Sequence, residues 1–224
     1  MKPIIGIISR VEYPGETHKL VFEEEYRQTI IKYGGIPLGI LPSQIVDYTV
    51  LKYSNQEDLT IEEKEMIIKQ LNLCDGFLMP GGFKMNKFDR FILEYIVKKD
   101  KPVLGICLGM QIMSNYKKEI VWNERNDSFI EHNVEKGLVH SVTLDKNSKL
   151  YSIVKNDNFM VTSRHSYHAL PNDYFNVVAL SDDNYIEAIE MNDKKFVIGV
   201  QWHPESMDDE TSRLLFESFI DACK

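Results

Sequence analysis

The sequence predicts an α/β fold, in which a mostly parallel central sheet lies between two layers of helices. In the first half of the chain, short apolar runs alternate with longer segments of helical periodicity, which is typical of a parallel sheet with helices on both faces. The second half is richer in strand-like runs. The chain shows no linker, repeat or low-complexity segment, so we expect one domain over residues 1–224.

Four strands and four helices are expected in the first half, and two helix boundaries carry a local signal. Gly34 and Gly35 would stop the first helix, and Thr60 followed by Glu63 is a capping box for the second. The expected strands are residues 3–8, 36–41, 76–79 and 103–106. The expected helices are residues 23–33, 61–73, 89–98 and the segment after Cys107 that carries Gln111.

Five strands and a closing helix are expected in the second half. The expected strands are residues 139–144, 159–162, 176–181, 186–191 and 196–201. Polar residues 192–195 form the turn between the last two strands. Asp208 begins the closing helix, whose acidic first turn suits the positive end of the helix dipole. Residues 47–58 are expected to form an irregular loop.

The composition limits the class of protein. The net charge of −8 argues against a nucleic-acid partner and against binding to anionic membranes. No apolar run approaches the length of a membrane span, and the amino terminus shows no signal region. Three unevenly spaced cysteines form neither a disulfide framework nor a zinc-binding pattern. We therefore expect a cytoplasmic protein that uses no cofactor and no metal.

Cys107 is the strongest candidate for a catalytic residue. It lies in a Gly-x-Cys-x-Gly run at residues 105–109, directly after an apolar run. Glycines on both sides allow a strand and a helix to approach closely at a sharp turn, which exposes the nucleophile at the carboxyl end of the strand. The helix amino terminus also favours the thiolate. Of the other two cysteines, Cys74 is expected to be buried and Cys223 to be exposed near the carboxyl terminus.

Two further segments complete a candidate catalytic site. Residues 199–205 supply His203 as a base and Glu205 to orient it, so that these two residues and Cys107 form a triad. Pro-Gly-Gly at residues 80–82 follows a predicted strand, and its backbone N–H groups can point into a cleft as an oxyanion hole requires. Each motif alone has an ordinary explanation: a buried cysteine, a strand end, a glycine turn. All three fall at carboxyl ends of predicted strands, where ligands bind, so we interpret them as one site.

With these motifs, the chain resembles the class I glutamine amidotransferase superfamily and, within it, the γ-glutamyl hydrolase branch. The similar segments are residues 2–7, 33–37, 161–165, 187–190 and 199–205, so the resemblance spans nearly the whole chain. It implies a flavodoxin-like three-layer sandwich. It also implies hydrolysis of a γ-glutamyl amide bond through a cysteine thioester.

The resemblance assigns a role to each residue of the candidate site. Cys107 would attack the δ-carbonyl of a γ-glutamyl group, His203 would carry the proton to the leaving amine, and Glu205 would hold the imidazole tautomer. The backbone N–H groups of Gly82 and Leu108 would bind the oxyanion. The implied contacts to the substrate are Gly81, Gln111, Ser163, Arg164 and His165, and the segment 163–166 would contribute backbone contacts.

The remaining histidines are given structural or solvated roles. His132 lies in a polar loop and His140 at a strand start, so both are expected to be solvated or capping residues. His165 and His168 could face the pocket, although a histidine beside an aromatic residue is more often structural. No cluster of His, Cys and Asp has the spacing of a metal site. Two aromatic residues could line the pocket or pack in the core: Trp122 and Phe129.

Because of three departures from the hydrolase branch, the sequence does not identify the leaving group of the substrate. Leu108 stands where the branch commonly has arginine, Ser206 follows the His-Pro-Glu as in true amidotransferases, and the loop at residues 83–90 is short. The chain could be a stand-alone hydrolase of γ-glutamyl amides of small amines, either alone or as a homodimer. It could also be a glutaminase subunit that passes ammonia to a separate synthase. The intact triad argues against a third hypothesis, a module that only binds or regulates.

Overall fold

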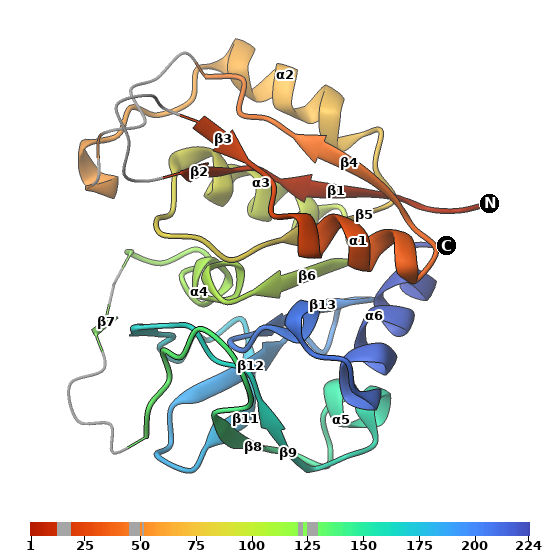
Figure 1. Ribbon diagram of the computed structural model, residues 1–224. Coiled ribbons are helices and arrows are strands. Elements are labelled where there is room, and N and C mark those ends of the chain that lie inside the picture. Colours follow the sequence, from red (N-terminus) through yellow and green to blue (C-terminus); the bar gives the residue numbers. More distant parts are fainter. Residues whose placement is uncertain (13–18, 45–49, 51, 121–122, 125–129) are drawn as a thin grey trace.

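A nine-stranded sheet forms the centre of the fold (Figure 1). The structure is a computed structural model that describes residues 1–12, 19–44, 50, 52–120, 123–124 and 130–224. Neighbouring strands are parallel from β4 to β13 and antiparallel from β13 to β9. In spatial order the strands are β4 (Ile36–Ile40), β1 (Ile4–Ile8), β5 (Gly76–Met79), β6 (Val103–Ile106), β13 (Val197–Val200), β12 (Ile186–Glu190), β11 (Asn176–Ser181), β8 (His140–Leu144) and β9 (Asn158–Val161).

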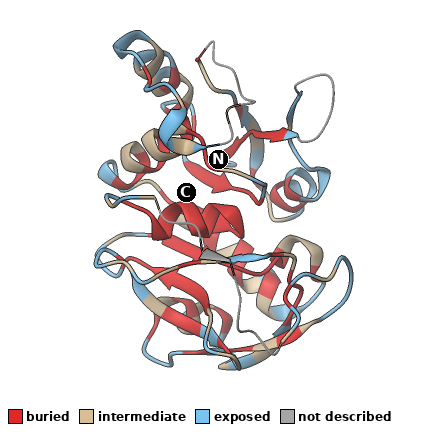
Figure 2. Ribbon diagram, turned by 90° about the vertical axis from the view of Figure 1, so that its left-hand side faces the viewer, coloured by how far each residue is buried: buried red, intermediate tan, exposed pale blue. Residues whose placement is uncertain are grey.

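Helices cover both faces of this sheet, which makes three layers (Figure 1). One face packs against α1 (Glu24–Lys32), α5 (Lys149–Val154) and α6 (Glu210–Ala222). The other face packs against α2 (Ile61–Leu71), α3 (Lys87–Lys98) and α4 (Leu108–Ser114). Each face has its own apolar core, and the exposed residues gather on the outer sides of the helices (Figure 2). The predicted α/β fold class is therefore confirmed.

The boundaries of most elements agree with the prediction to within two residues, because local signals fix them. The capping box of α2 is present: the Glu63 N–H donates to Thr60 Oγ1 at 3.2 Å, and the Thr60 N–H donates to Glu63 Oε2 at 2.8 Å. Helix α3 begins at Lys87, two residues earlier than predicted, because Asp89 accepts a hydrogen bond of 2.8 Å from the Asn86 N–H and caps that end.

Short elements were missed by the sequence analysis because they are too brief to show a period. They are α5, the hairpin of β2 (Arg10–Glu12) and β3 (Lys19–Val21), the pair β7 (Asn123–Glu124) and β10 (Tyr167–His168), and the 3₁₀ helices η1 (Tyr53–Asn55) and η2 (Pro204–Ser206). Parts of the predicted loop at 47–58, and both Trp122 and Phe129, lie outside the described residues. No helix in the described part of the chain combines the length and the apolar character that crossing a membrane requires.

The prediction for Cys223 was wrong. This residue is 7% exposed, and its thiol donates to the Phe219 carbonyl oxygen at 3.1 Å. It is buried because the end of α6 packs against β5, where a Cβ added at Gly76 would lie 2.1 Å from the sulfur. Burial raises the pKa of Cys223 to about 12 and that of Cys74, which is buried as predicted, to about 11.

Candidate active site

The three predicted catalytic segments meet at one edge of the sheet, on the left in Figure 1. Residues 80–82 follow β5, Cys107 follows β6, and His203 comes shortly after β13. These strands are adjacent and parallel, so their carboxyl ends lie side by side. A cavity of about 630 Å³ opens there and is lined by Gly81, Gly82, Cys107 and His203, among others.

The backbone at Cys107 is a sharp turn between β6 and α4. Its φ is +51°, a region that residues other than glycine adopt only when the surrounding structure enforces it. The flanking glycines are required by close approach, as predicted. A Cβ at Gly109 would lie 2.0 Å from the Met79 carbonyl oxygen, and one at Gly105 would lie 2.9 Å from the Gly109 carbonyl carbon. The turn that carries the thiol is therefore tightly packed against β5.

His203 and Glu205 are held by both backbone and side-chain contacts. The His203 Nδ1 lies 2.5 Å from Glu205 Oε1, and the Glu205 side chain is fully buried. The Thr162 hydroxyl donates to the His203 carbonyl oxygen at 2.8 Å, and the His203 N–H donates to the Thr162 carbonyl oxygen at 3.2 Å. A Cβ added at Gly81 would lie 3.2 Å from His203 Cε1 and 3.7 Å from Cys107 Cβ. The imidazole and the thiol thus flank the same glycine.

The charges at this site favour a protonated imidazole. Burial of His203 opposes protonation, but the negative charges of Glu205 and of a Cys107 thiolate outweigh it and raise the pKa of His203 to about 10. An imidazolium next to a thiol stabilises the thiolate, which is the nucleophilic form of cysteine. The arrangement is therefore suited to nucleophilic attack at neutral pH.

Arg164, a predicted substrate contact, contacts the carboxylate of the candidate triad. Its Nη2 lies 3.2 Å from Glu205 Oε1 and 3.0 Å from Ser206 Oγ. Ser206 in turn donates to Glu25 Oε2 at 2.7 Å. These contacts fix the Glu205 carboxylate between Arg164 and His203, and they attach it to α1. Arg164 also lines the cavity.

Arg10 is a residue of the site that the sequence analysis missed. Its guanidinium donates to the Pro80 carbonyl oxygen at 2.9 Å and to the Gly81 carbonyl oxygen at 3.1 Å, and it pairs with the buried Asp89 at 2.5 Å. In a trans peptide the C=O and the following N–H point in opposite directions. Because Arg10 holds the Gly81 C=O, it also sets the direction of the Gly82 N–H. No local pattern signals such a role.

The other predicted substrate contacts divide into two groups. Gln111 and His165 line the cavity, and the Gln111 amide donates to the Tyr167 carbonyl oxygen at 3.0 Å. Ser163 is fully buried, its hydroxyl donates to the His132 carbonyl oxygen at 2.6 Å, and it is not among the described residues that line the cavity. Ser166, in the predicted contact segment, also lines the cavity, and further lining residues that were not predicted are Glu23, Tyr53, Phe83, Lys84, Met85, Asn133 and Tyr167.

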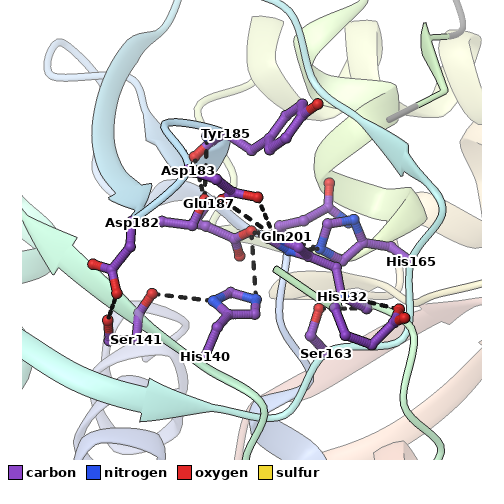
Figure 3. A network of polar contacts seen from close by, with 12 residues as sticks. His132, His140, Ser141, Ser163, His165, Asp182, Asp183, Tyr185, Glu187 and Gln201 are labelled. Atoms are coloured by element: carbon purple, nitrogen blue, oxygen red, sulfur yellow. Dashed lines mark hydrogen bonds and ion pairs between the residues drawn. The ribbon is translucent and has the colours of Figure 1, made fainter. Parts of the chain in front are cut away.

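The expectation that His132 and His140 are solvated or capping was wrong. Both side chains are buried, at 0% and 3% exposure. They are brought together with His165 and Glu187, all four within one compact polar cluster (Figure 3). The four residues are spread from position 132 to position 187 and meet in the antiparallel part of the fold.

Comparison with known proteins gives a family and a set of relatives. A family profile described as Peptidase C26 matches residues 84–205, more than half of the chain. The γ-glutamyl-γ-aminobutyrate hydrolase of Escherichia coli strain K12 is 25% identical over 256 residues, covering 99% of this chain and 94% of that protein. One component of the glutamine-hydrolysing GMP synthase of Methanothermobacter thermautotrophicus is 29% identical over 151 residues, covering 67% of this chain and 75% of that protein.

A solved structure of low sequence identity shares the fold. The glutaminase domain of Trypanosoma brucei CTPS superposes with a TM-score of 0.65 at 18% identity, covering 99% of this chain and 94% of that chain. This similarity concerns the arrangement of the sheet and its helices.

Proposed function

The chain belongs to the Peptidase C26 family, and from this membership and the residues around Cys107 we propose that it hydrolyses a γ-glutamyl amide bond through a cysteine thioester. The observation that carries the proposal is that Cys107 and His203 line one cavity while Glu205 contacts the His203 Nδ1 behind it at 2.5 Å. We propose the same single domain over residues 1–224 that the sequence predicts. Three free cysteines and a thiolate nucleophile suit a reducing cytoplasm.

The proposed reaction has two halves. In the first, the Cys107 sulfur bonds to the δ-carbon of the γ-glutamyl group, the C–N bond breaks, and His203 passes the thiol proton to the leaving amine. In the second, water attacks the thioester, the C–S bond breaks, and the proton returns through His203 to the thiol. The N–H groups of Gly82 and Leu108 would stabilise the oxyanion in both halves. Leu108 is the first residue of α4, so its N–H has no acceptor within the helix.

The cavity suits a zwitterionic substrate of modest size. Its lining carries Glu23 and Lys84, which have opposite charges and could face the α-amino and α-carboxylate groups of a γ-glutamyl moiety. Burial, and then the charge of Glu205, raise the pKa of Glu23. A relative of similar length is named as a hydrolase of γ-glutamyl-γ-aminobutyrate, which supports a small amine as the leaving group.

A glutaminase subunit that supplies ammonia to a synthase is the second candidate. Leu108 and Ser206 favour it, since both match true amidotransferases, and a relative named as part of a synthase shares the sequence similarity. The test is to assay the isolated chain against glutamine and a panel of γ-glutamyl amines. Turnover of one amine well above glutamine would support the hydrolase. Slow turnover of glutamine alone would support the second candidate, and no turnover with an unreactive Cys107 would contradict both.

Cys107 is expected to be alkylated before the other two cysteines. Brief treatment with iodoacetamide near neutral pH, followed by peptide mapping, measures the order. Cys74 and Cys223 are buried, and their pKa values are raised to about 11 and about 12, so they hold very little thiolate. Labelling of Cys107 should be at least about tenfold faster. Equal labelling of Cys107 and Cys223 would show that the thiol at the turn is not activated.

The variant Arg10→Lys is expected to slow the reaction without weakening substrate binding. Lysine keeps the charge beside Asp89 but cannot hold two carbonyl oxygens in the same plane. The Gly82 N–H would then be less well oriented, and we expect kcat to fall about 10- to 100-fold, somewhat less than the loss of a whole oxyanion-hole donor. The matched control is Arg27→Lys, which changes an exposed arginine paired with Glu24. An unchanged kcat in folded Arg10→Lys would show that Arg10 serves only stability.

A further inference from the structure

Three imidazoles and one carboxylate converge in the interior of the antiparallel half of the fold (Figure 3). His140 is the first residue of β8 and Glu187 lies in β12, while His132 and His165 lie in segments outside the long strands. All four residues are buried, with exposures of 0% to 3%. The cluster is therefore built by tertiary structure and is shielded from solvent.

The four inward-facing atoms are spaced as the ligands of one metal ion are. The His132 Nδ1 lies 3.3 Å from His165 Nε2 and 3.4 Å from Glu187 Oε1. The same carboxylate oxygen is 3.5 Å from His165 Nε2 and 3.8 Å from His140 Nε2, and all four atoms lie within 4.8 Å of one another. Around a tetrahedral Zn²⁺ with bonds of about 2.0–2.1 Å, neighbouring ligand atoms are about 3.3–3.4 Å apart.

The outer nitrogen of each imidazole is engaged by an oxygen acceptor. His140 Nδ1 lies 3.0 Å from the Ser141 carbonyl oxygen, and His165 Nδ1 lies 2.9 Å from the Tyr167 carbonyl oxygen. A carbonyl oxygen can only accept, so these two outer nitrogens carry the protons and each Nε2 presents a lone pair inward. His132 Nε2 lies 3.0 Å from the Asp183 carboxylate, the pairing that commonly orients a metal-binding histidine.

Three polar atoms of Glu187 and His140 in the cluster lack hydrogen-bond partners in the part of the chain that the structure describes. Within the described residues, both carboxylate oxygens of Glu187 and the Nε2 of His140 make no hydrogen bond. Glu187 Oε1 lies 3.4–3.8 Å from the nearest nitrogens of the three imidazoles, which is longer than the usual N–H···O distance of about 2.9 Å. A buried carboxylate without hydrogen-bond donors is strongly disfavoured unless a cation binds it.

The charges of the cluster also call for a cation. Glu187 and Asp183 place two buried carboxylates in contact with the imidazoles of the cluster. A divalent ion bound between these groups would balance the negative charge of both carboxylates.

We propose that His132, His140, His165 and Glu187 bind a divalent transition-metal ion, and that Zn²⁺ is the ion that fits best. Three imidazoles and a carboxylate gathered in one compact set are typical of zinc. Four protein ligands leave no open coordination position, so the ion is structural and takes no part in hydrolysis. The proposal is independent of the function proposed above.

The metal would fix one wall of the cavity at the candidate active site. His165 lines that cavity, as do Ser166 and Tyr167, which follow it in the chain. The Tyr167 carbonyl oxygen accepts from both His165 and Gln111. Binding of the ion would join this wall to β8 and β12. Its loss should loosen the wall while leaving the turn at Cys107 in place.

The test measures bound metal and thermal stability on the full-length chain, purified without a histidine tag. After incubation with ZnCl₂ and desalting, mass spectrometry of the elements should find about one Zn²⁺ per chain. Removing the ion with a strong chelator should lower Tm, and returning ZnCl₂ should restore it. Co²⁺ in place of Zn²⁺ should give the intense visible absorption of a tetrahedral site.

Matched variants separate this site from incidental binding. His140→Gln and Glu187→Gln should each lose at least about 90% of the bound metal, because removing a ligand breaks the closed tetrahedral set. His168→Gln changes a histidine of the same region outside the set of four and should keep it. Less than about 0.1 equivalent in the wild-type protein, or equal metal in Glu187→Gln and His168→Gln, would overturn the proposal. If Glu187→Gln fails to fold, the chelator experiment on the wild-type protein decides.

Discussion

Cys107→Ala is expected to abolish turnover of the γ-glutamyl amide that the wild-type protein hydrolyses, with the fold retained. Alanine keeps the Cβ at φ +51° and removes only the sulfur, so the turn between β6 and α4 should persist. No other described cysteine lines the cavity, because Cys74 and Cys223 are buried elsewhere. The loss should therefore reach the background rate of the assay.

Activity and Tm should be measured together for this variant. The matched control is Cys223→Ala, which removes a buried thiol that packs against Gly76 at the start of β5, the end opposite to the candidate site. It should keep kcat even if its Tm falls. Activity near wild type in a folded Cys107→Ala protein would refute the thioester mechanism.

Glu205→Gln is expected to lower kcat by about 10²- to 10³-fold, and His203→Asn by more. The Glu205 carboxylate accepts the proton-bearing Nδ1 of His203, and an amide at this position can instead stabilise the other tautomer. The same kind of change in a serine triad costs about 10⁴-fold. The fall in kcat should be smaller in a cysteine triad, because a thiol ionises more readily than a hydroxyl. KM should change little in either variant.

The competing explanation is that Glu205 has only a structural role, in which it anchors Arg164 next to η2. In that case Glu205→Gln would lower Tm but leave the kcat of the folded protein near wild type. Glu24→Gln, which alters an exposed carboxylate in α1 beside Arg27, is the control for a general effect of removing a negative charge.

The location of the candidate active site could be predicted because its determinants are local. The glycines at 105 and 109 are needed by one turn, and that turn follows one strand. Parallel strands then bring Cys107 and His203 to the same edge. The three catalytic roles stay predictions, but the proximity on which they depend follows from short segments of sequence and from the order of strands.

The histidine cluster could not be predicted, because its members are scattered from residue 132 to residue 187. No two ligands have the close spacing of a metal-binding motif, and their meeting depends on how β8, β11 and β12 pair. Arg10 was missed for a related reason: its partner Asp89 is 79 positions away, and a buried ion pair leaves no periodic pattern. Cys223 was misjudged because nearness to a chain end was taken to mean exposure.

The parallel and antiparallel halves of the sheet carry different parts of the proposed active site. The thiol, the imidazole and the glycine turn all follow parallel strands, whereas the wall with Ser166 and Tyr167 lies in the segment after β9, the last strand of the antiparallel half. Replacements in that wall can alter which amine fits without touching the turn at Cys107.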